Sequence, residues 1–128
     1  MTRMEFIARI ARMVHDLSPE QTAASVRAAL ESGLSPADVM EGISMGMEAV
    51  GEDYKRQKAF LPELLLAEQC LRAGLNEIET FVDDGDLHTV EEARQQLAER
   101  AASWLPALSS CVTRLLHSSD SFLVSKQK

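Results

Sequence analysis

The segment from Ser35 to Ala67 constrains the fold more than any other part of the chain. Its first half carries apolar residues at intervals of three and four, the spacing of one face of an α-helix. Two glycines, Gly42 and Gly46, lie one helical turn apart within it. A short basic stretch, residues 55–58, precedes a second apolar-periodic run that opens at Leu61. The segment therefore predicts two helices joined by a short basic loop.

Helix-start signals recur along the rest of the chain. Ser18-Pro19 and Ser35-Pro36 each place an N-cap serine before a proline at the first helical position. Gly33 is typical of the end of the helix between them. Thr89 to Glu92 has the sequence of a further capping box. Because no segment shows the alternation of a β-strand, we predict an all-α fold.

We expect three consecutive parts in this all-α chain. Residues 1–82 form a four-helix bundle, residues 83–117 form a helical extension and residues 118–128 form a polar tail. The extension is expected to hold two helices, at about 90–103 and 107–117. The residues expected to face inward in the fourth and fifth helices are Leu64, Leu65, Leu71, Leu75, Ile78 and Val82, then Val90, Ala93, Leu97, Ala101 and Trp104.

Charge and composition exclude several classes of function. The net charge is −7 and aromatic residues make up 5% of the chain, which argues against a nucleic-acid binder or a protein that binds anionic membranes. No apolar run approaches the roughly 20 residues that cross a bilayer, so we expect no membrane association and a cytoplasmic location. The two cysteines, Cys70 and Cys111, are expected to be reduced thiols.

The glycines and Phe60 each leave two interpretations open. A glycine inside a helix costs about 1 kcal/mol relative to alanine, which the close approach of a neighbouring backbone or of a flat ligand can offset. Phe60 precedes the fourth helix and is either a hydrophobic staple or a residue that faces a flat ligand. Met47 and its neighbouring methionines belong either to the core or to a cofactor surface.

One run of residues resembles a known family in both order and spacing. The run comprises Pro36, Val39, Gly42, Gly46, Met47, Val50, Gly51, Tyr54, Phe60, Leu61, Pro62 and Glu63. It is similar to the helical cap module that precedes the cobalamin-binding domain in corrinoid proteins and in cobalamin-dependent methionine synthase. The similarity covers residues 3–82 and is most specific over 35–70.

This resemblance implies a four-helix bundle that lies over the upper face of a corrin and shields the cobalt-bound methyl group. Cobalamin is then the expected cofactor. Phe60 and Leu64 are the implied corrin-facing residues, together with Met47 and Gly46.

The following α/β domain of that family is not evident here. Its loop carries Asp-x-His-x-x-Gly, with the histidine as the lower cobalt ligand. Asp86 and His88 match the start of this motif, but Glu91 stands where the glycine is expected. About forty residues remain, which is too few for a doubly wound sheet. A helix N-terminal turn therefore accounts for His88 better than cobalt ligation does.

Three functions remain compatible with these residues. The first is a corrinoid-associated binding module whose partner is a corrinoid, a corrinoid-binding domain or a methyltransferase. The second is a cofactor-free interaction module that self-associates through the former corrin-facing surface, and we favour a homo-oligomer. The third is a truncated corrinoid protein. No phosphate loop, zinc-protease motif or nucleophile elbow is present, so we expect no enzyme but at most an accessory part of a corrinoid methyl-transfer system.

Overall fold

The computed structural model describes residues 2–81, 87–101 and 104, and these form an all-α protein, as predicted. The helices are α1 (Arg3–His15), α2 (Pro19–Glu31), α3 (Pro36–Lys55), α4 (Leu61–Phe81) and α5 (Leu87–Ala101). Within the described residues no strand occurs. None of the described helices has the length and hydropathy that crossing a membrane requires.

The predicted helix-start signals act at α2 and α3. The Ser18 and Ser35 hydroxyls accept hydrogen bonds from the backbone N–H groups of Gln21 and Asp38. At α3 the Asp38 carboxylate also accepts from the Ser35 N–H, which completes a capping box. Gly33, just after α2, has φ +101°, the left-handed conformation that glycine adopts without strain.

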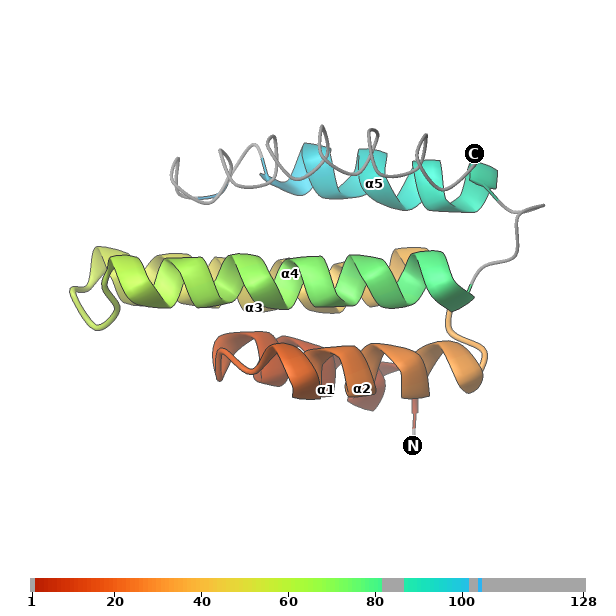
Figure 1. Cartoon of the computed structure of the whole chain (residues 1–128), viewed down its shortest axis with the longest axis horizontal. Helices are drawn as coiled ribbons and strands as arrows, with labels where there is room; N and C mark the ends of the chain where they lie inside the picture. The colour runs from red at the N-terminus through yellow and green to blue at the C-terminus, as the bar shows by residue number, and fades with distance from the viewer. Residues whose placement is uncertain (1, 82–86, 102–103, 105–128) are drawn as a thin grey trace.

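The helices form three layers. α1 packs on α3 and on α2, α2 packs on α4, and α3 and α4 pack together as a long hairpin. Figure 1 shows α1 and α2 on one side of the α3–α4 layer and α5 on the other. The core between these layers combines residues of all five helices.

The predicted interior of the bundle is mostly confirmed, with one error. Leu64, Leu71, Leu75 and Ile78 are buried, but Leu65 is 50% exposed. Three leucines in succession, 64 to 66, span too wide an arc of a helix for all to face the core, and only Leu64 does. Val82 lies outside the described residues.

The extension is confirmed as helical where the structure describes it. α5 begins at Leu87, so Thr89 lies inside its first turn and not at the N-cap that we predicted. Leu97, Ala101 and Trp104 are buried as expected. The side chains of Val90 and Ala93, the helix expected at 107–117 and the tail at 118–128 lie outside the described part, and the three-part division itself stays a prediction.

Glycines allow α1 and α3 to pack closely. A Cβ placed on Gly42 would lie 2.9 Å from the Ile7 carbonyl oxygen, and one on Gly46 would lie 2.5 Å from Val14 Cβ and 2.8 Å from the Ala11 carbonyl oxygen. Neither position has room for a side chain. The neighbour that offsets the cost of these two glycines is therefore α1, through both its backbone and its side chains, and we call this contact the glycine interface.

Candidate functional site

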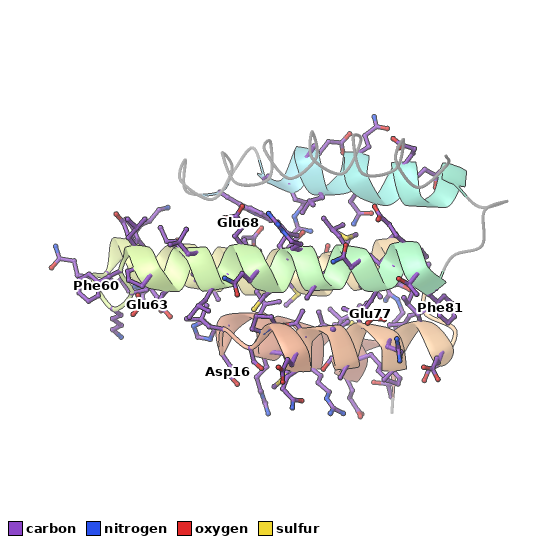
Figure 2. The ribbon with its side chains drawn as sticks, in the orientation of Figure 1. Asp16, Phe60, Glu63, Glu68, Glu77 and Phe81 are labelled. Atoms are coloured by element: carbon purple, nitrogen blue, oxygen red, sulfur yellow. The ribbon has the colours of Figure 1, made fainter. Side chains whose placement is uncertain are left out.

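An exposed apolar cluster lies at the start of α4, at the end of the hairpin that α3 and α4 form. Phe60, Leu61 and Leu65 are 61%, 62% and 50% exposed. Figure 2 shows Phe60 at the end of the hairpin, projecting away from the bundle. We call these three residues the tip patch. Burying apolar surface of this kind is favourable at about 25 cal/mol per Å², so a patch held open is a candidate binding surface.

Local hydrogen bonds hold Phe60 in this position. Its backbone N–H donates to Glu63 Oε2 at 3.1 Å, and its carbonyl accepts from the N–H groups of Glu63 and Leu64. Ala59 and Leu64, which occupy the two positions of a hydrophobic staple, are both buried. Phe60 is therefore not the staple, and its ring is free to contact a ligand.

The loop that leads to Phe60 is anchored to two helices. The Asp53 carbonyl near the end of α3 accepts hydrogen bonds from the N–H groups of Lys58 and Ala59, at 2.7 and 3.2 Å. The Asp53 carboxylate lies 2.6 Å from His15 Nε2, at the end of α1. Gln57 adopts φ 63°, a conformation that is uncommon for a residue other than glycine. These contacts fix the direction in which the chain enters α4.

The four residues that the resemblance implies as corrin-facing lie in different environments. Phe60 is exposed, whereas Leu64 is 2% exposed and Met47 is fully buried in the core. Gly46 lies in the glycine interface. In this conformation only Phe60 of the four presents its side chain at the surface. Contact of any of them with a corrin stays a prediction.

Two members of the tip patch were not identified as site residues from the sequence. The sequence predicts Leu61 only as part of a helix start and Leu65 as a core residue. The spacing of Leu61 and Leu65 indicates a shared surface, because residues four apart lie on one face of a helix. Leu64 already fills the inward position, so that face points outward.

The remaining candidates offer no alternative site. His88 lies in the first turn of α5, and its side chain is outside the described part. Among the described residues no group of three or more His, Cys, Asp or Glu side chains is placed to hold a metal ion. Burial raises the pKa of the Cys70 thiol, partly offset by a hydrogen bond with Thr22, so this thiol stays protonated near neutral pH.

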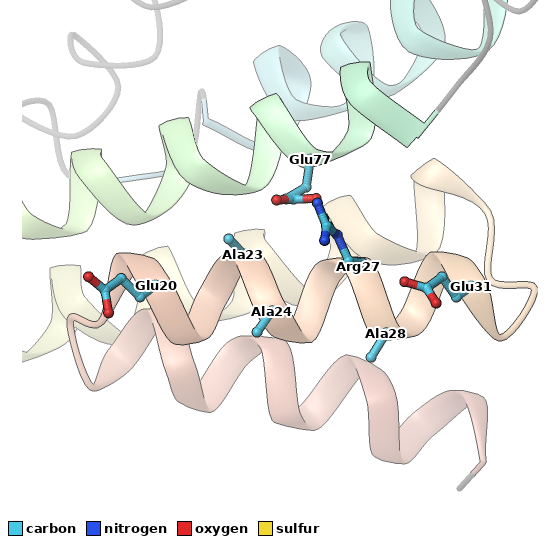
Figure 3. Close-up of a pocket in the computed structure, with 7 residues that line it drawn as sticks. All are labelled: Glu20, Ala23, Ala24, Arg27, Ala28, Glu31 and Glu77. Atoms are coloured by element: carbon cyan, nitrogen blue, oxygen red, sulfur yellow. Dashed lines mark hydrogen bonds and ion pairs between the residues drawn. The ribbon is translucent and has the colours of Figure 1, made fainter.

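A shallow hollow of about 400 Å³ lies between α2 and α4. Figure 3 shows the ion pair between Arg27 and Glu77 across it, with an Arg27 Nε to Glu77 Oε2 distance of 3.2 Å. Its other lining residues are alanines and two glutamates of α2: Glu20, Ala23, Ala24, Ala28 and Glu31. Small alanine side chains and an acidic rim do not provide the flat apolar contact that the tip patch does.

The fold and the tip patch together define a cap-like helical bundle. Comparison with protein families assigns it more closely: the model described as "B12 binding domain" matches residues 6–79. The chain belongs to this family. The matched residues comprise most of α1, all of α2 and α3, and nearly all of α4, and they end before α5.

Curated relatives are corrinoid proteins of methanogens. The chain is 33% identical over 75 residues to trimethylamine corrinoid protein 2 of Methanosarcina mazei, covering 58% of this chain and 34% of that one. It is 24% identical over 109 residues to monomethylamine corrinoid protein 1 of Methanosarcina acetivorans, covering 70% of this chain and 50% of that one. The chain thus spans about a third to a half of the length of these relatives. No solved structure matches the chain significantly.

Proposed function

We propose that this chain is a corrinoid-associated cap whose tip patch covers the upper face of a cobalamin that another domain holds. The observation that carries the proposal is the fixed exposure of Phe60 and Leu61 at the start of α4, inside the region that matches the family. The relatives are named for corrinoids and for methylamines, which supports a place in a methyl-transfer system with a corrinoid-bearing domain or a methyltransferase as partner.

The tip patch provides contacts for only one face of a corrin. An aromatic ring flanked by two leucines can exclude water from one face of a flat macrocycle. The hydrogen bonds of Glu63 and Asp53 fix the direction in which the backbone carries this ring. When bound, the corrin would supply the methyl–cobalt chemistry. This chain's own contribution would be to shield the upper face from water and to leave it when a reaction partner approaches.

Two exposed phenylalanines provide a matched test. Phe60 directly precedes α4 and Phe81 is its last residue, and their exposed fractions are 61% and 47% (Figure 2). We expect free methylcobalamin to bind weakly, with Kd on the order of 1 mM, because only one face of the corrin is contacted. Phe60→Ser should raise this Kd several-fold and Phe81→Ser should leave it unchanged, as measured by visible absorption.

Two results of that titration would contradict the cap role. One is equal binding by the Phe60→Ser variant and the unmodified protein. The other is tight binding with displacement of the lower base that disappears in His88→Ala, which would assign His88 as a cobalt ligand and make the tip patch secondary.

A second candidate function rests on the same exposed surface. Large exposed apolar patches mark interaction sites, and a second copy of this chain is one possible cover for the tip patch. A cofactor-free module that self-associates through Phe60, Leu61 and Leu65 should show a mass that rises with concentration in light scattering. A monomer that remains monomeric into the high micromolar range, or a dimer unaffected by Phe60→Ser, would exclude it.

A further inference from the structure

The contact between α5 and α3 differs in chemistry from the other helix contacts. Ala37, Glu41, Ser44 and Glu48 recur at spacings of four, three and four and so share one face of α3. Arg100 of α5 forms ion pairs with both Glu41 and Glu48, the latter at 3.1 Å from Arg100 Nη2 to Glu48 Oε1. Gln96 Nε2 donates to the Ala37 carbonyl at 3.3 Å. Charged and amide groups therefore align the two helices.

These polar contacts are only partly protected from water. The side chains of Arg100, Glu41 and Glu48 are 31%, 37% and 42% exposed. Ion pairs with this exposure contribute little and weaken in salt. The ion pairs of the α5 contact are therefore sensitive to ionic strength, whereas the glycine interface is formed by apolar side chains and backbone.

Two buried polar atoms find no hydrogen-bond partner in the described structure near this contact. They are Ser44 Oγ on the α5-facing side of α3 and Trp104 Nε1 just beyond α5. A buried donor or acceptor without a partner costs about 1–3 kcal/mol. Separation of the two helices would return both atoms to water, so this cost opposes docking of α5.

Among the described residues, α5 packs chiefly on one other helix. Its principal helix contact is with α3, whereas each of α1 to α4 packs on at least two other helices of the bundle. The family match ends at residue 79, before α5 begins. The four-helix cap thus has mutual contacts that persist without α5.

Release of α5 would uncover the side of α3 that carries Ser44. Met40 and Met47 lie four residues before and three after Ser44, so they adjoin it on the helix surface. Both are fully buried, in the same core cluster as Leu97 and Trp104 of the extension. Methionine side chains adapt well to the surface of an incoming apolar ligand.

We propose that α5 is a releasable strap: it detaches from α3 while α1 to α4 stay folded, and its release gives a corrin ligand access to Met40, Ser44 and Met47. Only the second half of this proposal, access of a corrin ligand, rests on the proposed function. The first half, detachment, can be measured with no corrinoid present.

Trp104 is the sole tryptophan of the chain and is 6% exposed, so its fluorescence reports the docking of α5. Arg100→Glu should shift its emission to longer wavelength and speed hydrogen exchange of α5 amides about tenfold or more, with α1 to α4 unchanged. The triple change Arg100→Glu, Glu41→Lys and Glu48→Lys restores opposite charges and should reverse both effects. Arg27→Glu, which breaks the ion pair between α2 and α4, is the matched control and should shift neither.

The detachment is refuted if the Arg100→Glu variant keeps the emission of Trp104 unchanged. It is equally refuted if α5 exchanges only together with α1 to α4, in one cooperative opening, because α5 would then be an integral part of the core.

Methylcobalamin serves as the probe for access. Arg100→Glu should lower its Kd several-fold relative to the unmodified protein and to Arg27→Glu, and Met47→Glu added to Arg100→Glu should abolish the gain. Release of α5 with no change in Kd would overturn the access half of the proposal. Release with no methylcobalamin binding by any variant would instead contradict the proposed function and leave the strap standing.

Discussion

The two opposite contacts of α3 are built on different principles. Toward α1, Gly42 and Gly46 bring the backbone of α3 directly against the backbone and side chains of α1, with no space for even a methyl group. Toward α5, the same helix presents Glu41, Ser44 and Glu48, and the contact depends on ion pairs and on three buried apolar residues, Leu97, Ala101 and Trp104. The first contact is dry, whereas the second combines buried apolar side chains with partly exposed ion pairs.

This difference coincides with the limit of the family match. The glycine interface lies within residues 6–79, and α5 lies beyond them. Close packing fixes one arrangement of α1 to α4, because a small displacement loses many contacts at once. Ion pairs at the surface tolerate separation and reclosure. The chain thus joins a rigid cap to an element whose attachment can be modulated.

The largest effect is expected at the glycine interface. Gly46→Leu would place a side chain where a Cβ already lies 2.5 Å from Val14 Cβ, so α1 must move away. Such overpacking costs about 3 kcal/mol of the free energy of unfolding. Urea unfolding followed by circular dichroism measures it. Met45→Leu, at the adjacent and 41% exposed position, is the control and should change little.

An unfolding midpoint for Gly46→Leu equal to that of the unmodified protein would show that α1 yields easily. The contrast between the two contacts of α3 would then be lost.

The next effect is expected at α5. Leu97→Ala removes a fully buried side chain and should weaken docking of α5 by about 2 kcal/mol, at the low end for such changes because the helix can shift to close the cavity. Hydrogen exchange should speed up in α5 and not in α1. The exposed neighbour Gln95 provides the control, Gln95→Ala. Equal acceleration in α1 and α5 would mean that the two contacts belong to one cooperative unit.

A smaller effect, of opposite sign, is expected at Ser44. Ser44→Ala removes a buried hydroxyl without a hydrogen-bond partner in the described structure, so it should strengthen docking of α5 by up to about 1 kcal/mol. Slower exchange of α5 amides would report this gain. Ser25→Ala removes a second such hydroxyl, on α2, and should not affect α5. A loss of docking in Ser44→Ala would reveal that this hydroxyl has a partner after all.

The sequence predicts the four-helix bundle more completely than it predicts the tip patch. Serine, proline and glycine signals act over three or four residues, and their structural effects at Ser18, Ser35 and Gly33 follow from local geometry. The periodicity of apolar residues likewise predicts most of the buried residues of α4. Such signals are local, and they suffice for an all-α bundle.

The tip patch and the α5 contact depend on distant residues, which explains why they were missed. The inward position at Leu64 and the outward position at Leu65 differ by one residue, and only the packing of α4 on α2 and α3 decides between them. The pairing of Arg100 with Glu41 and Glu48 joins residues more than fifty positions apart. No spacing rule within one helix predicts such a contact.

The smallest effect concerns the far end of the glycine interface and disappears in acid. The Arg3 guanidinium donates a hydrogen bond to the Asp38 carboxylate at 2.9 Å, and this bond, assisted by the Ser35 N–H against the opposing effect of burial, lowers the pKa of Asp38. A carboxyl whose pKa is lower in the folded state binds its proton more readily when unfolded. Its contribution to stability is therefore complete above about pH 4 and is lost as the pH falls through the folded pKa. Arg3→Gln removes the guanidinium but leaves the Ser35 and Asp38 capping box, so the free energy of unfolding at neutral pH should fall slightly and the acid unfolding midpoint should move to slightly higher pH. The difference from the unmodified protein should disappear below the folded pKa of Asp38. Arg9→Gln, an exposed change on the same helix, is the control. If both variants moved the acid midpoint equally, the effect would be one of overall charge, and the α1–α3 contact would owe its strength to the glycines alone.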